Sequence, residues 1–493
     1  MSGARGQPNI VLLITDTQGR EMVSSYVDRP GVATPNIDRL STQGVLFENA
    51  FTTCPLCTPA RSSLYTGLYP SRNGAFANEL AVMRHVPMLG EVLRDRGYQT
   101  FHVGKWHLDA AGYSGGGRAD AGFDPAAWYD LTNFYDEVGR AGINRFGGWN
   151  KGLHDIEYCF AHRVADRSID ILRRQRDYPS PFFLAVSFDE PHGPYICPPP
   201  FRGQSAKTGI YVPPTLNAPL ECKPRIQQEY AAFLAAHREN PATLPAYYYR
   251  YYDCNAYVDY EIGRVLEAIE RLCSEDTVII YTSDHGDHLG AFGLMAKGPT
   301  MYDHTIAVPL IIRLPQPGAS GWRSSALVSL VDVWATILDL GGVFRDGSNG
   351  VSKAGYSGRS LLPILHGVQT AVRDAVYVEY NRFAIDRHQT DGFFPIRCIR
   401  TADWKLSINL FDRDELYDLR SDPEEVRNLI DEPSYRSIRD HLHDRLLQCQ
   451  DAALDVFRGP CWGRRPWRGD YSHQFEGFFT TGWRDLWEGE PFQ

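Results

Sequence analysis

The stretch that decides the fold is Asn9–Thr15, NIVLLIT, which is followed directly by Asp16. A continuous run of Ile, Val and Leu is typical of a strand buried on both faces, as in a parallel sheet. A helix is expected next, over Thr34–Gln43, because Pro35 suits a first turn and Gly44 a helix end. Open α/β proteins build their sites where parallel strands end, so Asp16 is a candidate site residue.

The same pattern recurs along the chain. Helix-like stretches, such as Tyr158–Arg174 and Tyr257–Arg271, separate further apolar strands, which we expect at Gln99–Val103, Phe182–Phe188, Thr277–Thr282 and Val308–Arg313. Strands that alternate with helices favour parallel pairing, with the helices packed on both faces of the sheet. The sequence therefore predicts an α/β fold with a mostly parallel central sheet sandwiched by helices, over residues 1–345.

One stretch within this region breaks the pattern. Residues 197–245 are rich in Pro and Ala and show little periodicity, which predicts an irregular insertion that wraps the main domain; a plain surface loop is an equal alternative.

The character of the sequence changes after residue 345. Short strands at Ala375–Tyr380 and Ile396–Leu410 precede a helix near Ser434–Val456, which predicts a smaller C-terminal α+β subdomain over residues 346–457 with an antiparallel sheet. The tail, 458–493, holds four Trp. We expect it to be an extended segment that aromatic rings pin to another surface, such as that of a second subunit in a homo-oligomer.

The composition is that of an ordinary globular protein. The 493 residues include 50 Lys and Arg and 60 Asp and Glu, a net charge of −10, with 43% hydrophobic and 22% charged residues. Disordered, collagen-like and coiled-coil classes are excluded. Nucleic acids and anionic membranes are not expected as partners, because both attract basic surfaces. An anionic substrate would need local cations.

The cysteines and the N-terminus bear on the compartment. Ten cysteines are far fewer than a small disulfide-stapled scaffold would carry. Met1–Asn9 is short and polar, the apolar run after it is too short for a signal peptide, and no later stretch is long enough to span a bilayer. We expect a cytoplasmic protein with reduced thiols.

The sharpest motif is Cys57-Thr58-Pro59-Ala60-Arg61, followed by Ser62-Ser63-Leu64-Tyr65-Thr66-Gly67. Pro59 suits the first turn of a helix, and Arg61 lies one turn from Cys57. Residue 57 is thus predicted at the electropositive start of a helix, beside a guanidinium. Such a place favours an anion.

This motif, C-x-P-x-R with L-x-T-G, resembles the signature of the type I sulfatases, in the alkaline-phosphatase superfamily. The resemblance covers nearly the whole chain. Its other parts, in the family's order, are Pro8-Asn9-Ile10 to Asp16, Gly104-Lys105-Trp106-His107-Leu108, Glu190-Pro191-His192, Thr282-Ser283-Asp284-His285-Gly286, and Glu415-Leu416-Tyr417-Asp418-Leu419 to Asp422-Pro423.

The resemblance implies a specific nucleophile. In the family a separate formylglycine-generating enzyme oxidises the motif cysteine, here Cys57, to an aldehyde. One hydroxyl of the aldehyde hydrate, activated by a metal, attacks sulfur and expels the alcohol; deprotonating the other hydroxyl then releases sulfate. A thiol or a serine has no second hydroxyl and could not clear the intermediate in this way.

The resemblance also implies one divalent metal, held by Asp16, residue 57, Asp284 and His285 with hard ligand atoms. Many sulfatases carry two adjacent Asp after the first strand, whereas here Thr17 and Gln18 follow Asp16. Gln18 is an alternative oxygen ligand. Ca²⁺ is the expected ion, with Mn²⁺, Mg²⁺ and Zn²⁺ as alternatives. The Asp284-His285 pair resembles the choline-sulfatase and phosphonate-hydrolase branches.

The other roles also come from the resemblance. Lys105 and Lys297 would bind sulfate oxygens, and Arg61 would orient residue 57 and its metal-bound oxygen. His107 would take the proton when sulfate is expelled. His192 is the candidate general acid for the leaving alcohol, with Lys297 as its competitor.

The substrate and two other functions stay open at this stage. Asn381, Arg382 and Arg397 are candidates for reading the alcohol part of the substrate, and this pattern is similar to bacterial sulfatases that act on sugar sulfates. The first hypothesis is hydrolysis of a sulfate monoester of a carbohydrate or other small alcohol. The alternatives are a phosphonate monoester or phosphodiester hydrolase of the same superfamily, and an anion-binding homologue in which Cys57 stays unconverted.

Overall fold

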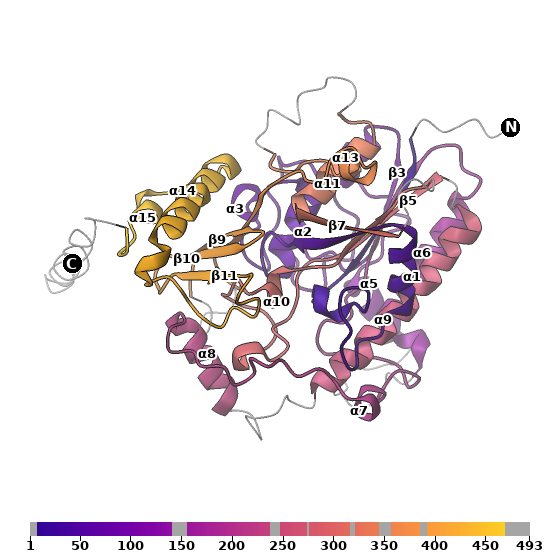
Figure 1. The fold of residues 1–493 in the computed structure, drawn as a ribbon. Helices are drawn as coiled ribbons and strands as arrows, with labels where there is room; N and C mark the ends of the chain where they lie inside the picture. The colour runs from indigo at the N-terminus through magenta and orange to yellow at the C-terminus, as the bar shows by residue number, and fades with distance from the viewer. Residues whose placement is uncertain are drawn as a thin grey trace, which may run out of the picture.

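The computed structural model describes residues 7–140, 155–236, 247–273, 276–315, 321–344, 356–384 and 392–468. Its centre is a seven-stranded sheet, and a four-stranded sheet lies beside it toward the C-terminus (Figure 1). The central sheet has the order β3-β4-β1-β5-β6-β2-β7, with β1 (Asn9–Thr15), β2 (Val45–Phe51), β3 (Gln99–Gly104), β4 (Phe182–Ser187), β5 (Thr277–Ser283), β6 (Leu310–Arg313) and β7 (Trp322–Ser329).

Both faces of β1 are apolar, so each face of this sheet needs a covering layer, and helices provide it. Ile10, Leu12 and Ile14 point into one core, while Val11 and Leu13 point into the other, as alternation along a strand requires. The first core includes α2 (Cys57–Thr66), α4 (Leu89–Arg94), α11 (Leu330–Leu340) and α13 (Leu362–Leu365). The second includes α1 (Pro35–Gln43), α5 (Leu131–Arg140), α6 (Phe160–Gln175) and α9 (Tyr247–Leu272).

The strand register aligns the ends of neighbouring parallel strands. Thr15 of β1 pairs with Ser283 of β5, and Gly104 of β3 pairs with Ser187 of β4. The residues that follow these strands therefore gather at one edge of the sheet. This edge is where the candidate site lies.

Helix α2 runs through the interior, and all of its residues are buried. It ends at Gly67, whose φ of 70° is left-handed and therefore favours glycine. A Cβ at this position would lie 2.4 Å from the Trp334 ring of α11. The glycine thus allows α11 to pack against α2 and fixes the depth at which Cys57 sits.

The second sheet has the order β11-β10-β9-β8, all antiparallel, with β8 (Ala375–Tyr380), β9 (Ile396–Thr401), β10 (Trp404–Asn409) and β11 (Glu415–Asp418). Helix α14 (Arg436–Ala453) packs on one face, and short α15 (Pro460–Gly463) lies beside it (Figure 1). On the other face, Val376 and Val378 pack against Phe51 and Leu56 of the larger unit. The second sheet is thereby held next to the start of α2.

The predicted fold class is confirmed, with corrections in detail. Strand β6 is antiparallel to both of its neighbours, so the expectation of a parallel strand there was wrong. Strands β2 and β7 were not predicted. The insertion, expected to be irregular, contains short α7 (Ser205–Thr208) and the longer α8 (Arg225–Ala236), which lies below the second sheet in Figure 1.

The first part of the tail packs against its own chain. Trp462 is buried in the core of the second sheet, and Trp467 packs against His443 of α14. Residues 469–493, with the other two Trp, lie outside the described residues. Among the described helices, none combines the length and apolarity needed to cross a membrane.

Candidate active site

Cys57 is the first residue of α2 and is 1% exposed. Its Sγ lies 2.7 Å from Lys297 Nζ, 3.3 Å from His285 Nε2 and 4.0 Å from Lys105 Nζ. Burial and the Asp16 carboxylate act to raise the pKa of the thiol. The cationic neighbours outweigh both and hold this pKa well below its ordinary value. The position therefore favours a negatively charged group, as the sequence predicted.

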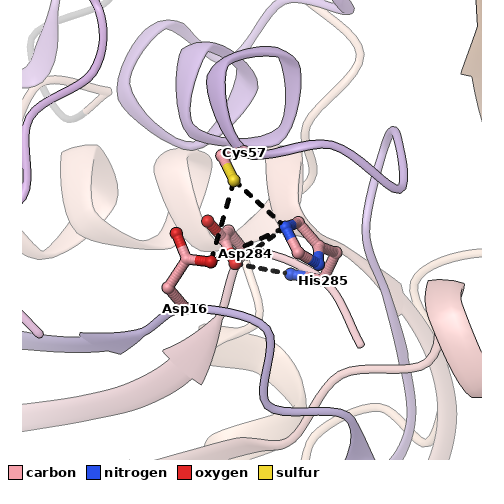
Figure 2. Close-up of side chains that lie close together, drawn as sticks. All are labelled: Asp16, Cys57, Asp284 and His285. Carbon is pink, nitrogen blue, oxygen red and sulfur yellow. Dashed lines mark hydrogen bonds and ion pairs between the residues drawn. The ribbon is translucent and has the colours of Figure 1, made fainter. Parts of the chain in front are cut away.

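Four side chains converge at the end of β1 and β5. Asp16, Cys57, Asp284 and His285 each offer one ligand atom, and these atoms lie within 4.8 Å of one another (Figure 2). The Nδ1 of His285 is 2.9 Å from the Gly286 carbonyl oxygen, to which it donates, so Nε2 keeps a lone pair directed into the group. The set combines hard carboxylate oxygens with one imidazole, and all four residues are buried. It fits a divalent cation.

The pKa values of the two carboxylates in this group are shifted in opposite directions. Burial acts to raise the pKa of Asp16, but the cations around it, Lys105 foremost, hold it well below its ordinary value. Burial and the neighbouring Asp16 raise the pKa of Asp284. A second negative charge beside Asp16 is therefore unfavourable without a further cation. A metal ion would supply that cation.

Arg61 contacts these carboxylates rather than the side chain of residue 57. Its Nε donates to Asp284 Oδ2 at 2.8 Å, and its Nη2 to Asp16 Oδ2 at 3.0 Å. Nη1 donates to Ser187 Oγ at 2.7 Å and to the Lys105 carbonyl at 3.1 Å. The guanidinium is fully buried, so it acts as a rigid brace that sets the spacing of the two carboxylates.

Lys105 and Lys297 approach residue 57 from two sides. Lys105 directly follows β3, and its Nζ lies 2.8 Å from Asp16 Oδ2 and 2.9 Å from Asp189 Oδ1. Lys297, after β5, lies 2.9 Å from His285 Nε2 in addition to its contact with Cys57. The two ammonium groups flank the thiol, as two cations that share one anion would.

His107 is held by Glu79, a residue that the sequence analysis did not select. Its Nε2 donates to Glu79 Oε1 at 3.1 Å. Burial acts to lower the pKa of His107, but hydrogen bonds to Cys57 and Glu79 raise it overall. Both His107 and Glu79 have left-handed φ values, 60° and 68°. Such strain in residues that bear side chains clusters at functional sites.

His192 is joined to two residues that were also missed. Its Nδ1 lies 2.8 Å from the Tyr113 hydroxyl, which in turn donates to Asp189. Asp189 follows β4 after a single residue, a position that could have drawn attention in the sequence. Tyr113 lies in a Gly-rich stretch with no pattern around it.

A cavity of about 710 Å³ opens from this centre. Cys57, His107, His192 and Lys297 lie on its lining. Much of its wall is aromatic or apolar and comes from helix α8 (Ile226, Tyr230 and Phe233) and from the end of β8 with the stretch after it (Tyr380, Phe383, Ala384, Gly392 and Phe394). The lining is completed by Tyr113, Asn78, Glu79, Glu229, Ala296, Gly298 and Pro299. Cavities of this size suit a small-molecule ligand.

Gln18 is engaged elsewhere. Its Oε1 accepts hydrogen bonds from Thr15 Oγ1, at 2.7 Å, and from the Tyr281 hydroxyl, while Nε2 donates to Asn255. Both lone pairs of the oxygen are occupied, so Gln18 braces the end of β1. Thr17, at the place of the second Asp, donates from Oγ1 to Asp16 Oδ1 at 2.7 Å.

The residues expected to read the alcohol part of a substrate do not line the cavity. Arg397 is fully buried between Asp455 and Glu379, beneath the Trp462 ring, which corrects its assignment as a substrate-binding residue. Asn381 is 1% exposed. Arg382 is half-buried and is also absent from the cavity lining, within the part of the chain that the structure describes.

The comparisons agree with the geometry. The sequence model of the family described as Sulfatase matches residues 8–343, and that of the C-terminal region of N-sulphoglucosamine sulphohydrolase matches residues 290–452. The chain belongs to the sulfatase family. This sulfatase is 35% identical over 485 residues to the uncharacterized sulfatase YidJ of Escherichia coli K12, with 96% of this chain and 93% of that protein covered.

Solved structures share the fold. One is that of BT4656 in complex with its substrate D-glucosamine-2-N,6-O-disulfate, with a TM-score of 0.72, 24% identity, and coverage of 91% of this sulfatase and 98% of that chain. Another is the phosphonate monoester hydrolase of Agrobacterium radiobacter, with a TM-score of 0.72, 22% identity, and coverage of 91% and 96%. Family membership makes the protein a sulfuric ester hydrolase of the alkaline-phosphatase superfamily.

Proposed function

We propose that this sulfatase hydrolyses a sulfate monoester of a carbohydrate or other small alcohol through formylglycine formed from Cys57. The observation that carries the proposal is the set of cations around residue 57. Lys297 Nζ is 2.7 Å and Lys105 Nζ 4.0 Å from Sγ, at the start of a buried helix. In the mature enzyme the thiol sulfur would be replaced by the hydrate oxygens, so the same cations would face a sulfate at that point.

One divalent metal completes the proposed site. Asp16, Asp284, His285 and residue 57 would hold it, and its chemistry would be that of a Lewis acid that lowers the pKa of an oxygen nucleophile. Ca²⁺ is our first candidate because two of the donors are carboxylates. The imidazole of His285 makes Mn²⁺ and Zn²⁺ the next candidates, with Mg²⁺ after them. Elemental analysis of the purified protein distinguishes these ions.

The side chains of the protein divide the remaining work. Lys105 and Lys297 would hold the peripheral sulfate oxygens, where negative charge must be balanced throughout the reaction. Arg61 keeps the two carboxylates fixed by its hydrogen bonds. His107 would take the proton from the second hydroxyl at residue 57, with Glu79 accepting the hydrogen bond from its other nitrogen. His192 would protonate the leaving alcohol.

The cavity wall supports a compact alcohol with an apolar face. Among its described lining residues are the rings of Tyr113, Tyr230, Phe383 and Phe394, against which a sugar ring or another flat apolar group can pack. The substrate that the BT4656 complex names is a sulfated sugar. Both observations support a sugar sulfate as the natural substrate class.

Mass spectrometry of the peptide that contains residue 57 tests the nucleophile. The protein is produced together with a formylglycine-generating enzyme, which we propose as its maturation partner. We expect a mass loss of about 18 Da, from the exchange of SH and H for an aldehyde oxygen, and sulfatase activity that rises with the converted fraction. The variant Cys57→Ala serves as the matched control without activity. An intact thiol in an active preparation would refute the formylglycine nucleophile, whereas an intact thiol together with no activity would favour an unconverted anion-binding homologue.

The second candidate is a phosphonate monoester or phosphodiester hydrolase. The Asp284-His285 pair in the metal group favours it, as does the fold shared with the Agrobacterium phosphonate monoester hydrolase. Both substrate classes are tetrahedral anions of similar size. Rates for matched aryl esters of sulfate, phosphonate and phosphodiester decide between them: we expect sulfate turnover to dominate, and a much faster phosphonate reaction would assign the second function.

We also propose a cytoplasmic location, because all ten cysteines, each in the described part of the chain, are single thiols. Cell fractionation with an antibody against the protein tests it, and recovery in the periplasmic or secreted fraction would contradict it.

A further inference from the structure

His192 makes two contacts through a single nitrogen. Its Nδ1 lies 2.7 Å from the Gly193 carbonyl oxygen and 2.8 Å from the Tyr113 hydroxyl oxygen. The same hydroxyl is hydrogen-bonded to Asp189 Oδ1. These contacts join two segments of the chain, since Tyr113 follows β3 and precedes α5, whereas Asp189 and His192 both follow β4.

The partners determine where the protons lie. A carbonyl oxygen only accepts, so His192 Nδ1 must carry a hydrogen. Asp189 accepts as well, so the Tyr113 hydroxyl hydrogen points to the carboxylate and the hydroxyl oxygen is left to accept from Nδ1. The result is a directed chain of hydrogen bonds from His192 through Tyr113 to Asp189. Nε2 is the ring nitrogen left for the cavity that His192 lines.

Tyr113 is itself held firmly in place. Its ring lies over Lys105 Nζ, 3.8 Å from the ring centroid, and the same ammonium is 2.9 Å from Asp189 Oδ1. Burial and the neighbouring carboxylate raise the pKa of Tyr113 well above its ordinary value, so the phenol stays a donor. The ring also packs edge-on against His107. One tyrosine thus contacts three of the side chains that surround residue 57.

We propose that Tyr113 is a positioning residue that couples the His192 ring to the Asp189 carboxylate, so that Nδ1 keeps its proton and Nε2 is turned toward the ester. The inference rests on the proposed function, in which His192 is the general acid. As an oxygen at residue 57 bonds to sulfur and the S–O bond to the alcohol breaks, the alcohol oxygen keeps the electron pair of that bond and takes the proton from Nε2. His192 is then neutral and still carries hydrogen on Nδ1, which the Tyr113 hydroxyl oxygen and the Gly193 carbonyl oxygen accept.

The variant Tyr113→Phe removes the hydroxyl and keeps the ring over Lys105. Alkyl sulfates have poor leaving groups that need a proton, whereas 4-nitrophenyl sulfate needs little help. We expect kcat on an alkyl sulfate to fall at least about tenfold, the usual range for removing a partner that orients a catalytic group, with KM nearly unchanged. On 4-nitrophenyl sulfate the loss should stay below about threefold.

Tyr230→Phe is the matched control. It removes one hydroxyl from the same cavity wall, but that hydroxyl donates to the Met295 carbonyl, and the described structure shows no contact between it and His192. Any loss in this variant should be the same for both esters. In a His192→Ala background, Tyr113→Phe should cause no further selective loss. Equal losses on both esters for Tyr113→Phe, or a selective loss that persists without His192, would overturn the proposal.

A measurement independent of turnover separates this inference from the proposed function. In ¹⁵N-histidine-labelled protein at alkaline pH, the neutral His192 ring, assigned by its absence in His192→Ala, should carry its hydrogen on Nδ1. Its Nδ1 resonance should move in Tyr113→Phe, because one of two acceptors is lost. A ring protonated on Nε2, or a resonance that Tyr113→Phe leaves in place, contradicts the inference. Absence of sulfate hydrolysis in the wild type contradicts the proposed function instead.

Discussion

Arg397, which the sequence suggested as a substrate-binding residue, instead forms buried ion pairs that stabilise the fold. Its guanidinium donates to both oxygens of Asp455, at 2.6 and 3.1 Å, and to the backbone carbonyls of Tyr380 and Ile396. Glu379 Oε2 lies 3.9 Å away. The two buried carboxylates depend on this single cation, so Arg397 neutralises the inner face of the second sheet.

We expect Arg397→Met to destabilise the protein without changing its chemistry. The substitution preserves volume but leaves buried Asp455 uncompensated, a loss of about 3–5 kcal/mol in the free energy of unfolding. Denaturant titration measures it, and kcat/KM of the remaining folded enzyme should change less than about twofold. Arg382→Met, on a half-buried side chain, is the control and should cost less than about 1 kcal/mol. A large rise in KM for Arg397→Met would instead support a role of Arg397 in substrate binding.

Site residues that directly follow strands could be predicted from the sequence. Site residues whose role depends on contacts with distant segments of the chain could not. Asp16, Lys105 and Asp284 come directly after apolar runs, which is a local signal. Glu79 and Tyr113 gain their importance from His107 and His192, which other segments of the chain bring to them. The burial of Arg397 depends on Asp455, 58 residues away, so no local pattern could reveal it.

At the scale of elements, Lys223 pins the insertion to the second sheet. It lies just before α8, and its Nζ donates to the Tyr417 hydroxyl at 2.7 Å and to the Glu425 carbonyl at 2.5 Å. The rings of Phe292, Tyr302 and Tyr417 surround it. Burial lowers its pKa from 10.5 to about 8, despite the carboxylates nearby. The ammonium is therefore less favourable in the folded protein than in the unfolded chain.

This shift gives a prediction with a definite sign. Between about pH 8 and 10.5 the folded state releases a proton that the unfolded state retains, so stability rises with pH. Over this interval the free energy of unfolding of the wild type should rise by roughly 3 kcal/mol relative to that of Lys223→Met, at about 1.4 kcal/mol per pKa unit. Unfolding titrations at several pH values measure the difference. The exposed Lys207→Met should show no such trend, and a flat difference for Lys223→Met would contradict the prediction.

The elements that the sequence predicted are those whose apolar residues show a clear pattern along the chain. Strand β1 is a continuous apolar run, and α6 repeats its buried positions at helical spacing. The direction of β6 could not be read because an apolar strand looks the same when it runs either way. Helix α8 was missed because Pro and Ala dominate its surroundings and Gln227 is its one buried residue.

At the scale of the whole molecule, cationic side chains of the protein brace the carboxylates of the metal group independently of any ion. Asp16 and Asp284 face Arg61, Lys105 and Lys297, and Asp189 offsets part of the remaining positive charge. The cavity that begins here is lined by α8 and by the end of β8, neither of which contributes a residue to the metal group. The fold should therefore persist when the ion is removed.

We expect chelation to abolish sulfate hydrolysis and to lower the melting temperature by no more than about 5 °C. Circular dichroism of the apo protein should match that of the holo protein, and adding back the divalent ion should restore activity. A chelated protein that loses its cooperative transition would show that the ion is structural. Asp284→Asn, which removes one ligand charge and keeps its shape, should reproduce the loss of activity without the chelator.

If Cys57 is matured as we propose, the depth of α2 sets an order of events in the life of the molecule. Every residue from Cys57 to Thr66 is buried, with α11 and the face of β8 packed nearby. A maturation enzyme that recognises the motif around Cys57 cannot bind it once those segments have packed against α2. They are translated some 270 to 320 residues later, so the nascent chain leaves an interval in which the motif is accessible. A cell that synthesises this protein faster than it can oxidise Cys57 would accumulate folded molecules that can no longer be activated.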